Sequence, residues 1–513
     1  MDIWSNIIAG FAVAVSLENL AYCLFGVFLG TFFGVLPGIG SLAAVSMLLP
    51  ITYYLEPTTA LVMLAGVYYG AEYGGSTASI LLNLPGTPSN AVTCLDGYPM
   101  TQQGRAGVAL FATTIASFVG GTCGILMLYA LSPIIVQWAL AFGPAEYFAV
   151  MIFGLVAAAT VTQDVPAKGL AMVVLGMALG TVGSDLDSGV ARFTFGFFEV
   201  RDGLSFIALA MGLFGLSEII MSIREKVNEP FIQKVTLRSM IPSRDDVRRS
   251  IGPTFRGAGI GGFFGALPGT GPSIATFVGY AIEKRIARDP SRFGKGAIEG
   301  ITSPESANNA AVQAAFIPTM TLGIPGSATM AVMMGALLIH GITPGPQLMT
   351  MNPEIFWGLA ASFWIGNLLL LVINIPMIGL WVRMLKIPYG VLYPAVICFI
   401  CIGVYTVRTS VFDVFVVLGF GLLGYSLRLL RFELAPILIG FILGPMVEEN
   451  FKRAMLIFRG DFSRMIERPI SGTLLAMTAM LLVWTIWTVI RDRRRGISDR
   501  MAAIEPTGKH NAD

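Results

Sequence analysis

Charged residues are scarce in this chain. Asp, Glu, Lys and Arg make up only 12% of its 513 residues, whereas 55% of the residues are hydrophobic and the mean hydropathy is +0.74. A water-facing surface cannot be built from so few polar groups, so a soluble protein is excluded. Apolar runs long enough to cross a bilayer recur from Leu20 to near Ile490, without the alternation that barrel strands show. We therefore expect an all-α polytopic membrane protein with about 11 to 13 transmembrane helices, at ~20 residues per crossing.

Residues that carry catalytic chemistry are also few. The chain has two histidines and five cysteines, and the P-loop motif GxxxxGK[ST] is absent from its sequence. The CxxC pair of Cys398 and Cys401 lies inside an apolar run without a partner pair, which favours packing over redox or metal chemistry. An enzyme would need a nucleophile, a base or a metal cluster. A membrane-embedded enzyme therefore ranks below a transporter or a channel, and we expect no enzymatic step.

The basic residues are gathered in three segments. Residues 224–256 hold eight Lys or Arg against four acids, residues 283–295 hold five against two, and the tail at 491–513 opens with four arginines within five residues. Such segments are typical of cytoplasmic loops. The 26 apolar residues at Gly257–Ile282 lie between the first two of them, so we expect a helical hairpin that enters the membrane and turns back, with its tip at Leu267–Pro272. A single kinked crossing is the alternative.

The chain contains an internal repeat. GTFFGVLPGIG at 30–40 returns as GGFFGALPGTG at 261–271, at an offset of 231, and NLPGTPSNAV from Asn83 returns as GIPGSATMAV from Gly323, at an offset of 240. Each copy is centred on Pro-Gly breaks in apolar sequence, which indicates duplicated repeats with broken helices. The first copy has acidic flanks, Glu18 and Glu56, where the second has basic ones. This difference predicts that the two repeats have inverted topology.

The repeat also predicts the organisation of the chain. Residues 1–223 form the first repeat, 224–256 a basic cytoplasmic linker, 257–490 the second repeat and 491–513 a basic, polar cytoplasmic tail. Each repeat should contain a hairpin followed by a broken helix. The expected ranges are hairpin 20–55 with broken helix 58–92, and hairpin 257–282 with broken helix 303–345.

The four break regions lack Lys and Arg but are rich in Gly, Ser, Thr and Asn. If the four tips converge, free backbone N–H groups and hydroxyls could hold an anionic carboxylate, and co-bound cations would offset its charge. The alternative is that the small residues only allow close helix packing. The residues expected to bind the substrate are Pro37, Gly38, Gly40, Ser41, Pro85, Gly86, Thr87, Ser89, Asn90, Pro268, Gly269, Thr270, Gly271, Ser273, Pro325, Gly326, Ser327 and Thr329.

Two acids, Glu72 and Glu305, lie in apolar sequence without a basic neighbour within one helical turn. Their offset of 233 suggests that they are repeat mates, followed by a seven-residue insertion. An unpaired carboxylate at membrane depth indicates function by default, and hard oxygen ligands suit Na⁺ or H⁺ as a coupling ion. Capping of backbone N–H groups is the alternative. The residues expected to serve the cation are Glu72, Ser76, Glu305, Ser306, Asn308 and Asn309. We expect no cofactor and no other metal.

Three stretches carry a family resemblance. GVLPGIG with GALPGTG, YGGSTASILLNLPGTPSNAVTCLDGYPM, and SPESANNAAVQAAFIPTMTLGIPGSATMAVMMGALLIHGITPGPQL resemble the large membrane subunit of the tripartite tricarboxylate transporters, over about residues 17–490. The resemblance implies a multi-pass permease of the bacterial inner membrane. Its expected partners are a small four-helix membrane subunit and a periplasmic substrate-binding protein.

The resemblance also implies a mode of transport. Members of that family carry out secondary transport driven by a cation gradient. Citrate and other tri- or dicarboxylates are typical substrates, and aromatic carboxylates also occur. By analogy with other carboxylate carriers, the duplicated hairpins suggest an elevator movement. A channel-like anion pore is the main alternative.

Overall fold

The computed structural model describes residues 3–36, 39–161, 166–185, 189–224, 235–269, 271–385 and 389–502. Within these ranges the protein is almost entirely helical, and β1 (Gly183–Ser184) and β2 (Ala191–Arg192) form one short antiparallel pair. Six helical stretches in the same ranges are long and apolar enough to cross a membrane. They lie at Leu17–Val35, Ala106–Ala139, Phe206–Ile223, Pro353–Asn374, Val411–Leu429 and Pro469–Trp487. The expected all-α polytopic class is confirmed.

The N-terminal half of the chain contains the first hairpin and the first broken helix. Its elements are α1 (Ile3–Ala14), α2 (Leu17–Val35), α3 (Gly40–Thr52), α4 (Pro57–Leu82), η1 (Pro88–Asn90), α5 (Ala91–Gln102), α6 (Ala106–Ala139), α7 (Pro144–Val161), α8 (Pro166–Gly180), η2 (Phe198–Val200), α9 (Phe206–Ala210), the π-helical turn η3 (Met211–Leu216) and α10 (Ser217–Arg224).

The C-terminal half contains the second copies. Its elements are η4 (Leu237–Met240), α11 (Arg244–Gly265), α12 (Gly271–Ile286), η5 (Pro290–Arg292), α13 (Glu299–Ala314), α14 (Phe316–Leu322), α15 (Ala328–Ile339), α16 (Pro346–Met351), α17 (Pro353–Asn374), α18 (Ile378–Met384), α19 (Tyr389–Arg408), α20 (Val411–Leu429), α21 (Ala435–Ile457), α22 (Ser463–Glu467) and α23 (Pro469–Ala502).

Close glycine packing joins the hairpin to the broken helix in each repeat. Three glycines of α2, four residues apart, lie against the α4 backbone, and three glycines of α11 lie against the α13 backbone in the same way. A Cβ added at Gly34 would lie 2.1 Å from the Ala71 carbonyl oxygen, and one at Gly261 would lie 2.1 Å from that of Ala307. The contacts are Gly26 with Met63, Gly30 with Val67 and Gly34 with Ala71, and Gly257 with Ser303, Gly261 with Ala307 and Gly265 with Ala311.

The second hairpin has two helical arms. Helix α11 ends at Gly265 and α12 begins at Gly271, so the turn between them overlaps the expected tip at Leu267–Pro272. Away from the tip, Arg256 Nε lies 2.6 Å from Glu283 Oε1, which brings the outer ends of the two arms together. Helix α11 begins at Arg244, inside the segment expected to be a linker, because Ser243 and Asp246 cap its first turn reciprocally.

Both broken helices are present. Helix α4 ends at Leu82 and α14 at Leu322, and the next residue in each chain segment, Asn83 or Gly323, adopts a left-handed backbone with φ of 58° or 70°. Only residues that tolerate positive φ can end a helix in this way, and a Pro-Gly step follows each of them. The equal offset of 240 shows that the two breaks are built alike.

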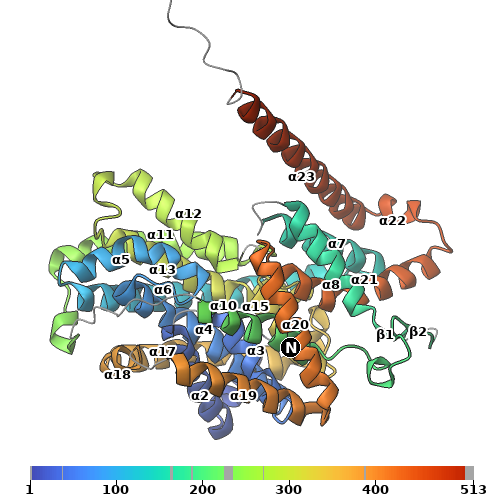
Figure 1. The fold of residues 1–513 in the computed structure, drawn as a ribbon, viewed down its shortest axis with the longest axis horizontal. Helices are drawn as coiled ribbons and strands as arrows, with labels where there is room; N and C mark the ends of the chain where they lie inside the picture. Colours follow the sequence, from blue (N-terminus) through green and yellow to red (C-terminus); the bar gives the residue numbers. More distant parts are fainter. Residues whose placement is uncertain are drawn as a thin grey trace, which may run out of the picture.

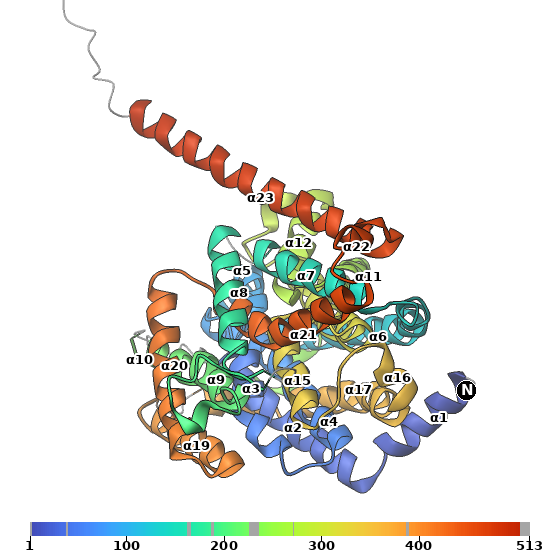
Figure 2. The ribbon, with the colours of Figure 1, turned by 90° about the vertical axis from the view of Figure 1, so that its right-hand side faces the viewer.

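The ribbon views show how these units are arranged. In Figure 1, α11 and α12 lie with α5, α6 and α13 on one side of the molecule, and α2 lies on the other side with α17 and α19. Helix α23 leaves the body in both views while its first turns stay near α7, on which it packs (Figures 1 and 2). The inverted orientation of the two repeats in a membrane stays a prediction.

Candidate functional site

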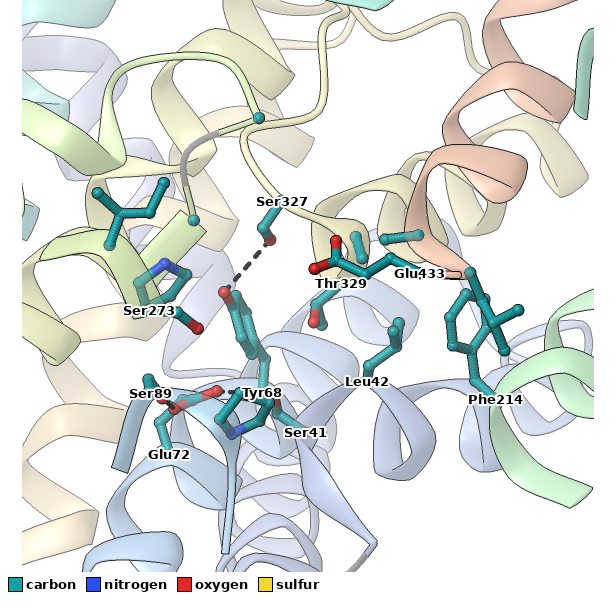
Figure 3. A pocket seen from close by; sticks show the side chains of 18 of the residues that line it. Ser41, Leu42, Tyr68, Glu72, Ser89, Phe214, Ser273, Ser327, Thr329 and Glu433 are labelled. Carbon is teal, nitrogen blue, oxygen red and sulfur yellow. Dashed lines mark hydrogen bonds between the residues drawn. The ribbon is translucent and has the colours of Figure 1, made fainter. Parts of the chain in front are cut away.

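The tips of both hairpins and both broken helices meet at one cavity of about 520 Å³. Its wall includes Ser41 of α3, Ser89 of η1 and Ser273 of α12, together with Ser327 and Thr329 at the start of α15. Figure 3 shows these hydroxyl-bearing side chains around a common space, with Leu42 and Phe214 at its apolar end. The predicted convergence of the four tips is therefore present in the structure.

Glu72 lies at the first-repeat side of this cavity and is only 3% exposed. Its Oε1 accepts a hydrogen bond from the Ser41 hydroxyl at 2.7 Å. Its Oε2 accepts from the Ser89 hydroxyl at 2.5 Å and from the Asn308 side-chain amide at 3.1 Å. The single proton of the Thr87 hydroxyl has two acceptors within reach, Glu72 Oε2 at 2.9 Å and Asn90 Oδ1 at 2.6 Å. Groups from α3, the first break and α13 thus hold one carboxylate.

Glu305 on α13 is held by the opposite repeat. Its Oε1 accepts hydrogen bonds from the Thr93 hydroxyl at 2.5 Å and from the Asn90 side-chain amide at 3.0 Å. The Ser117 hydroxyl of α6 approaches Oε2 at 3.5 Å. In the part of the chain that the structure covers, the donors to both acids are side chains, so the alternative in which these acids cap backbone N–H groups finds no support there.

Three amide oxygens of α13 are buried without a hydrogen-bond partner among the described residues: Asn308 Oδ1, Asn309 Oδ1 and Gln313 Oε1. The amide nitrogens of the two asparagines are used, because Asn308 donates to Glu72 and Asn309 to the Glu305 carbonyl oxygen. Buried acceptors that lack donors are costly, and hard neutral oxygens are what a Na⁺ ion binds. The residues present therefore fit a cation. Gln313 was missed in the sequence, although it lies one turn after Asn309 on the same helix.

Comparison with known proteins gives the family of the chain. The sequence model described as "Tripartite tricarboxylate transporter TctA family" matches residues 20–439. The chain belongs to the TctA family. It is therefore a component of a tripartite transport system, which acts with partner subunits.

Two curated relatives of this TctA chain come from Agrobacterium vitis. One, "Uncharacterized 52.8 kDa protein in TAR-I ttuC' 3'region", is 46% identical over 494 residues, which cover 96% of this chain and 98% of the relative. The other, "Uncharacterized protein in TAR-II ttuC' 3'region", is 48% identical over 234 residues, which cover 46% of this chain and 97% of the relative. No solved structure matches this TctA chain.

One expectation about the acids is wrong. In the TctA fold the packing of α13 on α11 repeats that of α4 on α2 at an offset of 240, from Met63 and Ser303 onward. At that offset Glu72 corresponds to Val312 and Glu305 to Ala65, so the two acids are not repeat mates. The nine residues by which 240 exceeds 231 lie between hairpin and broken helix, where a loop absorbs them.

The other predicted residues of TctA fall into three groups. Gly269 and Gly271 line the cavity with the serines and Thr329, whereas Gly40 begins α3 beside it. Several others serve packing or helix bonds. Gly86 lies against Gly34 and Gly75, Gly326 lies against Ala315, Ser76 bonds the Tyr73 carbonyl and Ser306 that of Thr254. The described cavity wall does not include Pro85, Pro268 or Pro325, and Pro37, Gly38 and Thr270 lie outside the described residues.

Tyr68 and Arg428 are among the cavity residues of TctA that the sequence argument missed. Tyr68, one turn before Glu72, is buried, and its hydroxyl lies 3.3 Å from Ser327 Oγ. Arg428 of α20 lines the same cavity and pairs with Glu218 of α10. The break regions themselves lack basic residues as expected, but the folded chain brings one to the cavity from a distant helix. The position of Arg428 in the sequence, far from the repeated motifs, did not indicate that it would reach the cavity.

Proposed function

We propose that this chain is the permease subunit of a secondary transporter that imports tri- or dicarboxylates, or related organic carboxylates, across the bacterial inner membrane by cation symport. A periplasmic binding protein would deliver the substrate, and a small four-helix membrane subunit would complete the permease. The C-terminus would face the cytoplasm. The observation that carries this proposal is the cavity at which two hairpin tips and two helix breaks meet.

The cavity chemistry supports a carboxylate together with a cation. Hydroxyls and helix N-termini supply neutral donors for a carboxylate, and a net positive helix end favours an anion. The buried acids and the unpartnered oxygens of Asn308, Asn309 and Gln313 lie on the adjoining helices and suit a small cation. Cation and anion would each reduce the electrostatic cost of the other, which is a physical basis for coupled movement.

Hydrogen bonds that join the two repeats support an elevator mechanism. The buried Asp96 of α5 accepts hydrogen bonds from the backbone N–H groups of Gly294, Gly296 and Ala297 at 2.9, 2.8 and 2.8 Å. Its other oxygen accepts from the Tyr280 hydroxyl of α12 at 3.0 Å. This carboxylate ties the first broken helix to the second hairpin and to the loop before α13, so the two repeats would travel together.

The test is uptake by the reconstituted complex of the three subunits. A panel of labelled carboxylates is offered with and without an imposed Na⁺ gradient, and with a proton gradient in a parallel series. Saturable, gradient-dependent uptake is the expected result. A channel-like anion pore would instead give uptake that does not saturate and shows no counterflow. Failure of the complex to take up any of the carboxylates would overturn the proposal.

A further inference from the structure

The cavity has two halves that are related by the repeat. In the first half, α3 begins at Gly40, and Thr87 and Ser89 follow the break. In the second half, α12 begins at Gly271, and the corresponding residues are Ser327 and Thr329. The offsets are the same 231 and 240 that relate the glycine contacts. The hydroxyls that follow the two breaks are therefore equivalent, whereas Ser41 corresponds to Pro272, and the next residue, Ser273, supplies a hydroxyl to the cavity wall.

The first half already binds a carboxylate, and it is the protein's own. The hydroxyls of Ser41 and Ser89 donate to Glu72, at 2.7 and 2.5 Å, and the Thr87 hydroxyl lies 2.9 Å from it. Asn308 adds a donor from the second repeat. This arrangement shows, inside the same molecule, that this pattern of hairpin tip and helix break holds a carboxylate group.

The second half has the donors, but α13 places no acid against them, and the carboxylate beside Thr329 is that of Glu433, from the segment between α20 and α21 (Figure 3). The residue that corresponds to Glu72 is Val312, which supplies no oxygen to Ser273, Ser327 or Thr329. The residue that corresponds to Asn308 is Tyr68, and its hydroxyl reaches the second half just as the Asn308 amide reaches the first. In Figure 3 Ser273, Ser327 and Thr329 lie around the end of the Tyr68 side chain, on the side of the cavity away from Glu72.

We infer that the second half binds a carboxylate group of the transported substrate, in the position that Glu72 occupies in the first half. The donors are the hydroxyls of Ser273, Ser327, Thr329 and Tyr68 with the starts of α12 and α15. The inference rests on the proposed transport of carboxylates. The two halves would then have different roles. The first half would hold the Glu72 carboxylate, which attracts the cation, and the second half would bind the substrate.

The experiment compares variants at repeat mates in the reconstituted complex. Thr329→Val and Ser89→Ala each remove one hydroxyl at positions 240 residues apart, and Tyr68→Phe removes the hydroxyl that crosses to the second half. The probe is the panel carboxylate that the wild type takes up fastest. Substrate KM and the cation concentration for half-maximal uptake are both measured, with thermal unfolding in detergent as the control for folding.

Thr329→Val and Tyr68→Phe should each raise the substrate KM about tenfold, since each loses a hydrogen bond to a charged group. Ser89→Ala should shift the cation requirement more than the substrate KM, because its hydroxyl binds Glu72. If Thr329→Val fails to fold, Tyr68→Phe carries the test, since the ring that fills the space remains. Unchanged substrate KM in the second-half variants, with a tenfold rise in Ser89→Ala, would overturn the inference. A wild type that takes up no carboxylate would overturn the proposed function instead.

Discussion

The Asn308 side-chain amide donates to Glu72 across the boundary between the two repeats, at 3.1 Å. A reciprocal contact runs from the Asn90 amide of the first repeat to Glu305 of the second, at 3.0 Å. Each acid is thus held partly by the repeat to which it does not belong. A change in the separation of the repeats would alter the donors of both acids at once, which links the charge of the site to the position of the helices.

The two acids give the first prediction. Glu72→Gln and Glu305→Gln keep the size but remove the charge that offsets a cation, so the cation concentration for half-maximal uptake should rise at least about tenfold, or uptake should cease. Glu56→Gln, which removes an exposed acid outside the cavity, is the matched control. An unchanged dependence of uptake on cation concentration in both detergent-stable variants would show that these acids have only a structural role. In that case each substitution should lower the free energy of unfolding on the order of 1 kcal/mol.

Two glycines of α11 form a matched pair that tests the close packing of α11 on α13. A Cβ at Gly261 would meet the Ala307 carbonyl oxygen at 2.1 Å, whereas a Cβ at Gly259 meets nothing within 4 Å. Gly261→Ala should lower the free energy of unfolding by about 1–3 kcal/mol through overpacking. Gly259→Ala should be neutral or slightly stabilising, because alanine favours helix. Thermal unfolding of both variants in detergent measures the difference, and equal midpoints would contradict the close packing.

The ion pairs at the outer end of the second hairpin predict its topology. Arg249 of α11 and Arg292 of η5 both bind Glu299, at 2.9 and 2.8 Å, so the two basic segments lie together. Single cysteines at Arg248 and Arg288 should therefore show the same protection from an impermeant periplasmic reagent, and full labelling after membrane disruption. Labelling of only one of them in intact cells would exclude a hairpin with both ends in the cytoplasm.

Asp96 should stabilise the joint between the repeats. Asp96→Asn keeps an acceptor for the three backbone N–H groups but loses the charge that strengthens these bonds, so we expect a loss of about 1–3 kcal/mol in unfolding free energy. Asp289→Asn, at an exposed acid bonded to its neighbour Ser291, is the control and should change stability little. The measurement is the denaturation midpoint of each purified variant. A larger effect at Asp289 would contradict the role of Asp96.

Glu433 places a negative charge at the mouth of the cavity. It is exposed, and its carboxylate points into the space bordered by Thr329 and Phe214 (Figure 3). Glu433→Gln should lower the substrate KM, by about two- to tenfold at low ionic strength, because the anionic substrate no longer meets a like charge. The effect should shrink as salt is raised. A KM that rises in this variant would show that Glu433 helps substrate binding.

The repeat motifs were sufficient to predict the hairpins, the breaks and their convergence, because Pro-Gly steps and positive-φ positions are local features that sequence shows directly. The prediction that Glu72 and Glu305 are repeat mates was wrong because it used an offset close to that of the first motif. The offset changes after the hairpin, since the loop before the broken helix differs in length between the two copies. Tyr68 and Arg428 could not be found, since their approach to the cavity depends on how distant helices pack. The unpartnered oxygen of Gln313 likewise appears only when its surroundings are known.

The close glycine contacts of α2 with α4, and of α11 with α13, have a mechanical consequence. Where Gly34 meets Ala71, and Gly265 meets Ala311, the backbones touch with no side chain between them. A Cβ at either glycine would meet a carbonyl oxygen, so the two helices of each pair have little room to slide or roll against each other. Each repeat therefore contains one closely packed pair of helices. If the repeats move during transport, the change in structure should fall in the contacts around these pairs and not within them.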